Sequence, residues 1–410
     1  MLESLRDSQS VNRVSVAIIG NGIAGSSAAR RLALTLPDHL SRISIYEIGR
    51  GPGGRGATRK TRSIPEFRIN HGAPYADIST HEGLTLLSSL GEPIQPYTGQ
   101  RGILDGKTGS VEPQGETDGV WLVVGADGEM AKIASSLILD GHGALLPPIA
   151  TEYATMIRGL SRGSEPGDPW RLFDKHGDEI GHADWLVVAG SAVAHPRWSD
   201  TFGGEPPLVT AASTLGDRGL DQSLAVIAKQ TAAPVLTVLL YATGGVAEAW
   251  QRLAFDDAII KHHDVLARIS IQPCGPTGCS VVLHSTICYA HEKPGVYGSS
   301  SSAARVGDAS SSADREQGII DEMLAALRTI PGMPKIEKSR YAFGPLLHRW
   351  GNAFPQGEPV PEALSVCPDS RVAFCGDYVS TSARMGSYEC ALLSGANVAD
   401  SLSRRIKGNQ

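Results

Sequence analysis

The chain has 410 residues, of which 41% are hydrophobic and 20% charged, and this composition excludes an extended disordered protein. Its formal net charge of −6 argues against a general nucleic-acid-binding protein, which would carry a basic excess. The 6 cysteines form no CxxC pair, so we expect neither a disulfide framework nor a metal site. No apolar run approaches the ~20 residues of a membrane span, and none is predicted.

The length exceeds what one compact core usually holds, so we expect two domains or one elaborated α/β domain. Residues 1–13 are polar and lack an apolar stretch, which predicts a flexible N-terminal tail rather than a secretory signal. Because the cysteines are expected to stay reduced, we predict a cytoplasmic location. An organelle stroma or matrix, reached after removal of a transit peptide, stays open as the alternative.

The first predicted elements are a strand, a glycine turn and a helix. The apolar run Val14–Ile19 leads into a GxGxxG turn, and small residues continue the pattern into a helix. Gly20 allows the tight turn, Gly22 lets the backbone approach a pyrophosphate, and Gly25 lets the helix pack close to the strand. The free N–H groups at the helix start would meet the phosphates. The pattern predicts a Rossmann dinucleotide-binding unit.

The next predicted strand ends in Glu47, at the spacing expected of the carboxylate that holds a ribose hydroxyl. These features alone would allow NAD as readily as FAD. The loop that follows contains Gly53, Gly54 and Arg55, and two adjacent glycines let backbone N–H groups crowd an anion while an arginine adds positive charge. This loop resembles the GGR segment of FAD enzymes of the amine oxidase and renalase type. We therefore predict FAD.

Further motifs, in the same order along the chain, resemble renalase-like flavoproteins of the amine oxidase superfamily. Phe67–Tyr75 resembles the segment that runs beneath the isoalloxazine ring, although Asn70 and Ala76 replace an aspartate and an aromatic residue. Val281–Thr286 resembles a strand of the family with the ending HST, and His348–Trp350 resembles its HRW motif. The resemblance extends from about residue 14 to residue 405.

The C-terminal part carries the strongest of these motifs. Val372–Asp377 is an apolar strand that ends in Gly-Asp, and a helix rich in small residues is predicted over Ser382–Ser403. In the family, the aspartate hydrogen-bonds the ribityl or phosphate region of the flavin, and the start of the helix, here Met385–Tyr388, faces the flavin N1/O2 edge. A helix N-terminus stabilises the negative charge that develops there on reduction.

The fold class predicted from these motifs is α/β, with a Rossmann-type FAD-binding domain and a second α+β substrate domain built on an antiparallel sheet. The segments assigned to the FAD-binding domain are 14–80, 125–195 and 340–405. The segments assigned to the substrate domain are 81–124 and 196–339. The strands expected in the antiparallel sheet are Pro234–Ala242, Val265–Ile271 and Ser280–Ile287. The serine-rich segment, residues 298–315, predicts a flexible surface loop, with a lid over the site as the alternative.

The candidate catalytic residues are His71, His348 and Trp350, which the resemblance places near the flavin ring or beside the substrate pocket. A histidine there could orient a substrate or take a proton, and a purely structural role is the alternative. His284, on a predicted strand of the substrate domain, has the same two interpretations. The predicted cofactor-binding residues are Gly20, Gly22, Ile23, Ala24, Gly25, Glu47, Gly53, Gly54, Arg55, His71, Gly72, Ala73, Ala154, Gly376, Asp377, Gly386, Ser387 and Tyr388.

The resemblance implies a noncovalent FAD-dependent oxidoreductase that takes a hydride from a small-molecule substrate to flavin N5. The first hypothesis is renalase-like oxidation of dihydronicotinamide isomers with O₂ as acceptor. An amine or prenylcysteine-type flavin oxidase is the alternative on the same fold. A non-catalytic FAD-binding subunit of a larger assembly is the rival from another class, for which Asn70 and Ala76 give some room. Substrate identity, electron acceptor and oligomeric state stay open.

Overall fold

A six-stranded sheet forms the centre of one half of the molecule. The computed structural model describes residues 13–163, 165 and 167–408, so the predicted N-terminal tail lies, except for Arg13, outside the described residues. The strands lie in the order β10 (Ile149–Tyr153), β2 (Leu40–Glu47), β1 (Val14–Ile19), β14 (Trp185–Val188), β21 (Val372–Phe374) and β20 (Val366–Cys367). All neighbours are parallel except the antiparallel pair β20–β21. The predicted Rossmann-type α/β fold is confirmed.

Both faces of this sheet are covered, which explains why its central strands are apolar on both sides. One face carries α1 (Ile23–Thr35), α3 (Ala131–Ile138) and α11 (Tyr388–Gly408). The other face carries the antiparallel sheet of β11 (Gly159–Arg162), β12 (Trp170–Phe173) and β13 (Glu179–Ala183), with α4 (Arg197–Phe202), α5 (Pro207–Ala212) and α6 (Arg218–Lys229). The small residues of α1 and α11 let them cross closely, since a Cβ at Gly395 would lie 2.2 Å from the Ala24 carbonyl oxygen.

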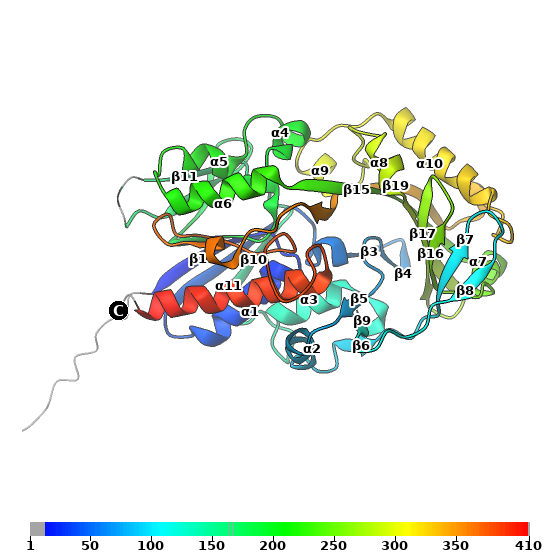
Figure 1. Cartoon of the computed structure of the whole chain (residues 1–410), viewed down its shortest axis with the longest axis horizontal. Coiled ribbons are helices and arrows are strands. Elements are labelled where there is room, and N and C mark those ends of the chain that lie inside the picture. The colour runs from blue at the N-terminus through cyan, green and yellow to red at the C-terminus, as the bar shows by residue number, and fades with distance from the viewer. Residues whose placement is uncertain (1–12, 164, 166, 409–410) are drawn as a thin grey trace, which may run out of the picture.

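A seven-stranded sheet forms the other half, drawn on the right of Figure 1. Its strands lie in the order β19 (Phe343–Gln356), β15 (Thr231–Thr243), β18 (Gly278–Ser285), β17 (Leu266–Cys274), β16 (Asp257–Lys261), β7 (Arg101–Asp105) and β8 (Val111–Pro113). The three strands predicted for an antiparallel sheet are present. Their sheet is mixed, however, because β7, from a distant segment, pairs in parallel with β16.

The two faces of the seven-stranded sheet have different neighbours. On β15, Leu236, Val238 and Leu240 point toward α7 (Gly244–Gln251), α8 (Ile287–His291) and α10 (Ala313–Arg328). Leu239 and Tyr241 point the other way and pack on the hairpin of β3 (Thr58–Thr61) and β4 (Ile64–Asn70). This hairpin lies between the two halves (Figure 1), so the second face of the sheet looks toward the six-stranded sheet.

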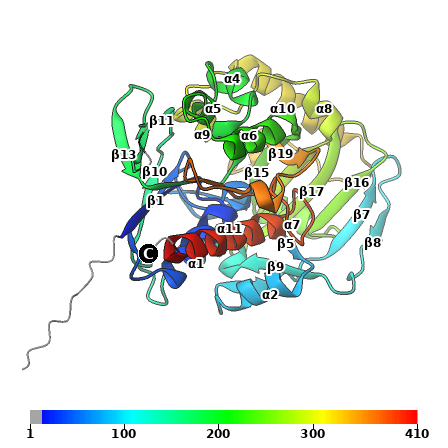
Figure 2. The ribbon, with the colours of Figure 1, turned by 60° about the vertical axis from the view of Figure 1, so that its left-hand side comes forward.

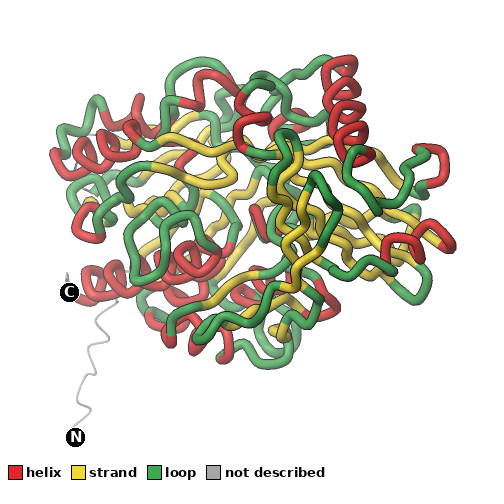
Figure 3. Tube along the Cα trace, turned by 45° about the vertical axis from the view of Figure 1, so that its right-hand side comes forward, coloured by secondary structure: helices red, strands yellow, loops and turns green. Residues whose placement is uncertain are grey.

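The remaining elements are a small sheet, two short helices and several turns outside these two halves. A small antiparallel sheet contains β5 (Ala76–Ile78), β9 (Trp121–Gly125) and β6 (Ile94–Pro96), and α2 (His81–Ser88) lies beside it, as Figure 2 shows. The short helix α9 spans Ser302–Arg305. The 3₁₀ turns are Gly54–Gly56, Ala126–Gly128, Ser191–Ala194, Lys338–Arg340 and Glu362–Leu364. Figure 3 shows the strands inside both halves and the helices around them.

Two predicted elements differ from the structure. The C-terminal helix begins at Tyr388, not at Ser382, and continues to the end of the described chain. The reason is Gly386, which has φ +80° and donates its N–H to the Asp377 carbonyl, so the chain before it cannot be helical. The serine-rich segment is not one uninterrupted loop, because it contains α9 and the first residues of α10.

The predicted division into an FAD-binding and a substrate domain stays a proposal. Core packing refines it in two places. Helices α4–α6, within 196–339, share a hydrophobic core with the six-stranded sheet. Strand β19, within 340–405, is hydrogen-bonded into the seven-stranded sheet. Within the described ranges, no helix is long and apolar enough to cross a membrane.

Candidate dinucleotide and substrate site

The turn between β1 and α1 is as tight as its glycines suggest. Gly20 has φ +106°, and a Cβ at Gly25 would lie 2.0 Å from the Gly20 carbonyl oxygen. Gly22 is the N-cap of α1 and supplies no side-chain cap, so the N–H groups of the first turn keep their donor capacity. The buried Ile23 and Ala24 hold this turn against the sheet. The helix start can therefore donate hydrogen bonds to an anion.

The second glycine loop touches the first. The Gly53 N–H donates to the Asn21 carbonyl at 2.8 Å, and a Cβ at Gly54 would lie 3.3 Å from the Gly22 Cα. Both Gly53 (φ +123°) and Gly54 (φ +54°) adopt left-handed conformations that favour glycine. The backbones of two loops, more than 25 residues apart in the sequence, therefore meet with no side chain between them.

Glu47 ends β2 beside these loops and is buried. Its carboxylate accepts the N–H groups of Asn21 (2.7 Å) and Gly49 (2.6 Å). Burial raises the pKa of Glu47, and these two hydrogen bonds oppose that rise. Ala154, at φ +54°, donates its N–H to the Gly49 carbonyl at 2.7 Å. Each Glu47 oxygen keeps a further lone pair, so a ligand hydroxyl can be accepted there.

Arg55 and Asp377 form a bidentate ion pair. Both N–H···O distances are 2.5 Å, and Arg55 also donates to the Ala353 carbonyl at 2.9 Å. Asp377 is buried directly after Gly376 at the end of β21, whereas Arg55 is partly exposed. Their predicted contacts with the cofactor stay predictions. The structure adds that the charge of each is already balanced by the other, which the sequence did not reveal.

The three candidate catalytic residues lie together and form the ring cluster of His71, His348 and Trp350. The ring centroids of His71 lie 4.8 Å from His348 and 5.1 Å from Trp350, and His348 and Trp350 are 4.3 Å apart. Trp350 Nε1 donates to the His71 carbonyl at 3.1 Å. Gly72 and Ala73 fix the segment on Arg55: the Ala73 N–H donates to the Arg55 carbonyl at 2.9 Å, and a Cβ at Gly72 would lie 2.2 Å from that oxygen.

The histidines of this region are held neutral. Burial, then Arg59, lowers the pKa of His71 to about 3. Burial, then His71 and Arg59, lowers the pKa of His348 well below its usual range. Burial and Arg268 lower the pKa of His284 to about 3, against the opposing effect of the His71 and Gly72 backbone. At neutral pH these rings can accept or donate a hydrogen bond but carry no charge.

Several buried polar atoms here have no hydrogen-bond partner among the described residues. Thr237 on β15 pairs with His284 on one side and His348 on the other, so the three side chains form a row on the inner face of the sheet. The unpartnered atoms of the region are Nδ1 of His71, His284 and His348, Oγ1 of Thr237 and the hydroxyl of Tyr388. Because such an atom costs about 1–3 kcal/mol when unsatisfied, the group is a candidate ligand site. Thr237 carries no sequence signal, since its role depends on register.

The start of α11 lies close to these residues. The Ser387 hydroxyl accepts the Cys390 N–H at 3.0 Å and caps the helix. A Cβ at Gly56 would lie 2.9 Å from the Tyr388 ring, so this ring packs directly on the second glycine loop. Burial raises the pKa of Tyr388. The segment Gly386–Tyr388 thus lies near the second glycine loop, which is also predicted to bind the cofactor. Its contact with a flavin stays a prediction.

Asn70 stands where the renalase-like flavoproteins have an aspartate, and its hydrogen bonds explain why this residue is an amide. Its Oδ1 accepts from the Thr58 hydroxyl (2.6 Å) and the Met130 N–H (3.1 Å). Its Nδ2 donates to the Gly128 carbonyl at 2.8 Å. A carboxylate could accept but could not donate, so only the amide satisfies all three contacts. The other replacement, Ala76, is buried in the core of the six-stranded half.

A second polar group, formed by Arg268, Asp257 and Tyr75, lies at strands β16 and β17 of the seven-stranded sheet. Arg268 and Asp257 form a bidentate pair with two distances of 2.8 Å, and the Tyr75 hydroxyl donates to Asp257 at 3.1 Å. The Arg268 guanidinium lies over the Tyr75 ring, which stacks on Tyr97 at 4.4 Å. Sequence reasoning missed this group because Asp257 and Arg268 meet only through the register of β16 and β17.

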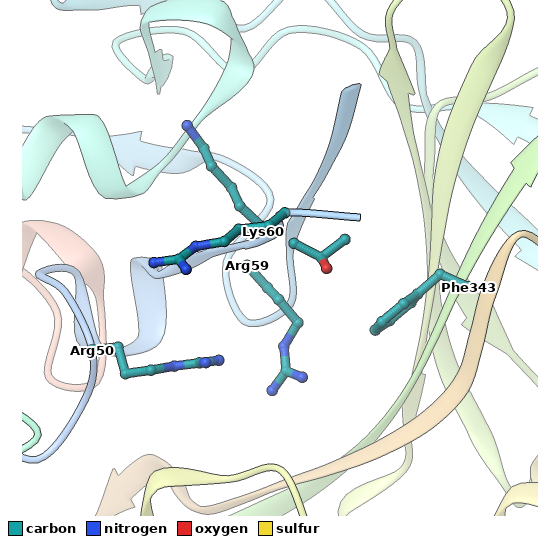
Figure 4. A pocket seen from close by; sticks show the side chains of 6 residues that line it. Arg50, Arg59, Lys60 and Phe343 are labelled. Carbon is teal, nitrogen blue, oxygen red and sulfur yellow. The ribbon is translucent and has the colours of Figure 1, made fainter. Parts of the chain in front are cut away.

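A basic cavity of about 720 Å³ lies against the hairpin of β3 and β4 (Figure 4). The residues that line it are Arg50, Arg59, Lys60, Thr61, Arg62 and Phe343. The Arg59 guanidinium donates to the Ser300 hydroxyl at 3.1 Å, so the serine-rich segment reaches the cavity. The sequence signal that could have found this cavity is the arginine-rich run after the second glycine loop.

Comparison with known proteins supports the fold. Residues 18–84 match a family model described as an NAD(P)-binding Rossmann-like domain, and no curated protein matches the chain. A candidate protoporphyrinogen oxidase from Exiguobacterium sp. 255-15 is similar over 96% of this chain and 99% of that chain (TM-score 0.58, 13% identity). A double mutant of putrescine oxidase is similar over 95% and 99% (TM-score 0.57, 12% identity).

A third structure, the Diels-Alderase of the pyrroindomycin pathway, is similar over 96% of this chain and 66% of that chain (TM-score 0.52, 15% identity). Identities at this level show a shared fold and do not fix a reaction. Two oxidases and a Diels-Alderase share the architecture, so the function has to be argued from the site.

Proposed function

We propose that the chain binds FAD noncovalently and oxidises a small-molecule substrate, with a dihydronicotinamide isomer as the substrate and O₂ as the acceptor, as in renalase-like flavoproteins. The observation that carries the proposal is the convergence of two touching glycine loops with the ring cluster and its unpartnered nitrogens. A dinucleotide with a planar redox-active end fits both features.

The residues present fit FAD. The first turn of α1 and the glycines Gly53 and Gly54 would hold its pyrophosphate, and Glu47 would accept a ribose hydroxyl. The segment His71–Ala73 would lie along the ring, with the N-terminus of α11 at another edge. When bound, FAD would supply a hydride acceptor, and the two electrons with one further proton would reduce O₂ to hydrogen peroxide.

The protein residues around the substrate suit hydride loss from a dihydronicotinamide. Breaking the donor C–H bond with its electron pair leaves an aromatic pyridinium cation, so no base has to remove a proton. His71 and His348, which are neutral, would orient the substrate through hydrogen bonds from or to their free Nδ1 atoms. The apolar ring face of Trp350 would pack on the substrate and exclude water.

Amine oxidation is the second candidate, and the shared fold of putrescine oxidase favours it. An alkylamine reaches an active site as an ammonium cation. Arg50, Arg59 and Arg62, which line the basic cavity, would repel that cation. The charge of the cavity therefore supports the dihydronicotinamide over the amine.

Anaerobic reduction of the flavin tests the proposal. We expect aged NADH, which contains the dihydronicotinamide isomers, to bleach the bound flavin in a stopped-flow experiment, while putrescine leaves it oxidised. Bleaching by the amine alone would contradict the first proposal and support the second. A protein that retains FAD, resists reduction by every donor and co-purifies with another chain would instead be a non-catalytic subunit.

A further inference from the structure

The arginines around the basic cavity have no acidic partners. Among the described residues, no carboxylate forms an ion pair with Arg50, Arg59, Arg62 or Arg305. Burial, followed by the charges of Arg50 and Arg305, lowers the pKa of Arg59 to about 10. Figure 4 shows the side chains of Arg50 and Arg59 both directed into the cavity.

The neighbouring lysine differs from Arg59, because Lys60 has a carboxylate partner. Lys60 follows Arg59 on β3, so its side chain leaves the opposite face of the strand, and Figure 4 shows it turned away from Arg59. Its ammonium pairs with Glu129 at 2.7 Å. One cation of the strand is thus neutralised by a carboxylate, whereas the hydrogen-bond partner of Arg59 within the described part of the chain is the neutral hydroxyl of Ser300.

Uncompensated like charges in a partly closed space repel one another and attract an anion. Guanidinium groups bind phosphate through paired N–H donors, and a serine hydroxyl adds a further donor. Because three arginines line the cavity, an anion with more than one negative charge would balance them best. A phosphate-bearing group meets this requirement better than a single carboxylate.

The cavity lies near the predicted reaction site. Arg59 pairs with Ile69 on β4, two residues before His71, and its charge lowers the pKa of both His71 and His348. The serine-rich segment joins the two places, because Gly298 packs on β19 so closely that its Cβ would lie 2.5 Å from the Leu347 carbonyl oxygen. A substrate could therefore react at the ring cluster while its charged end lies at Arg59.

We propose that Arg59, together with Arg50 and Arg62, forms a phosphate subsite for the substrate, so that the enzyme selects phosphate-bearing, nucleotide-like donors over uncharged or cationic ones. This inference rests on the proposed function, to which it adds a substrate class. The pyrophosphate of FAD is the other source of the same chemistry, and the experiment has to separate the two. The N–H groups of α1 and the glycine loops already provide for the cofactor.

Binding of ADP-ribose to the flavin-loaded protein tests the subsite. ADP-ribose carries two phosphates and cannot donate a hydride, so calorimetry reports binding alone. We expect Arg59→Met to weaken ADP-ribose binding about tenfold or more, because a charge-assisted contact is lost, while the FAD content stays at that of the unaltered protein. Lys229→Met removes one positive charge from the last turn of α6, which does not line the cavity, and should change neither. If Arg59→Met fails to fold, the exposed Arg50 and Arg62 provide Arg50→Met and Arg62→Met.

A kinetic comparison sharpens the result. In Arg59→Met, kcat/KM should fall for the dinucleotide isomers and stay unchanged for the isomers of dihydronicotinamide riboside, which carry no phosphate. Unchanged ADP-ribose affinity would overturn the subsite. Loss of FAD at unchanged ADP-ribose affinity would assign the arginines to the cofactor and also overturn it. If no dihydronicotinamide reduces the flavin but ADP-ribose binding still depends on Arg59, the proposed function fails and the subsite stands.

Discussion

Replacing Gly72 with alanine tests whether the ring cluster depends on the close contact of two backbone segments. A Cβ at position 72 would lie 2.2 Å from the Arg55 carbonyl oxygen and 3.1 Å from the Trp350 ring. Since the oxygen belongs to the backbone, relief requires the His71–Ala73 segment to move by about 1 Å, the scale at which overpacking costs about 1–3 kcal/mol. The same movement would break the hydrogen bond from Ala73 to Arg55.

We expect Gly72→Ala to lower the free energy of unfolding by about 1–3 kcal/mol and to slow flavin reduction, because His71 and Trp350 would shift together. Urea unfolding and stopped-flow reduction provide the two measurements. Gly51→Ala is the matched control, since a Cβ there meets nothing within 4 Å. If Gly72→Ala equals Gly51→Ala in both assays, the claimed contact does not position the ring cluster.

Three further predictions follow from buried polar groups. In a double-mutant cycle, Arg55→Met and Asp377→Asn should show a coupling energy of about 1–3 kcal/mol in urea unfolding, and a value near zero would refute the ion pair. Asn70→Asp should destabilise the fold by about 1–3 kcal/mol through loss of its donor to Gly128, and equal urea midpoints would contradict that. His71 has a folded pKa of about 3, below the unfolded value of about 6.5, so its stabilisation is complete above pH 6.5 and falls with pH down to 3. Urea midpoints of His71→Asn should therefore depend less on pH in that window, and an unchanged slope would argue against a neutral histidine.

Local patterns predicted the nucleotide-binding half well. The strand at Val14–Ile19 and the glycine turn encode their own geometry, because Gly25 must approach the Gly20 carbonyl for the helix to pack. The resemblance to a known family singled out His71, His348 and Trp350, which are far apart in the sequence. The structure places their rings in contact.

What sequence reasoning missed depends on register and on distant pairing. Thr237 lies between His284 and His348 only because β15 pairs with β18 and β19 in one particular register. The parallel pairing of β7 with β16 joins segments about 150 residues apart, and no local pattern encodes it. Likewise, Arg59 and Lys60 are adjacent cations in the sequence, and only the fold shows that Glu129 pairs with Lys60.

The most direct test of the central claim is the cofactor content of the purified protein. We expect a visible flavin spectrum, bleached by aged NADH without oxygen, and release of intact FAD into the supernatant when the protein is precipitated with acid. Gly25→Ala, whose Cβ would lie 2.0 Å from the Gly20 oxygen, should lose the flavin, whereas Gly51→Ala should keep it. A colourless protein that takes up no added FAD, or one that binds NAD instead, would contradict the account.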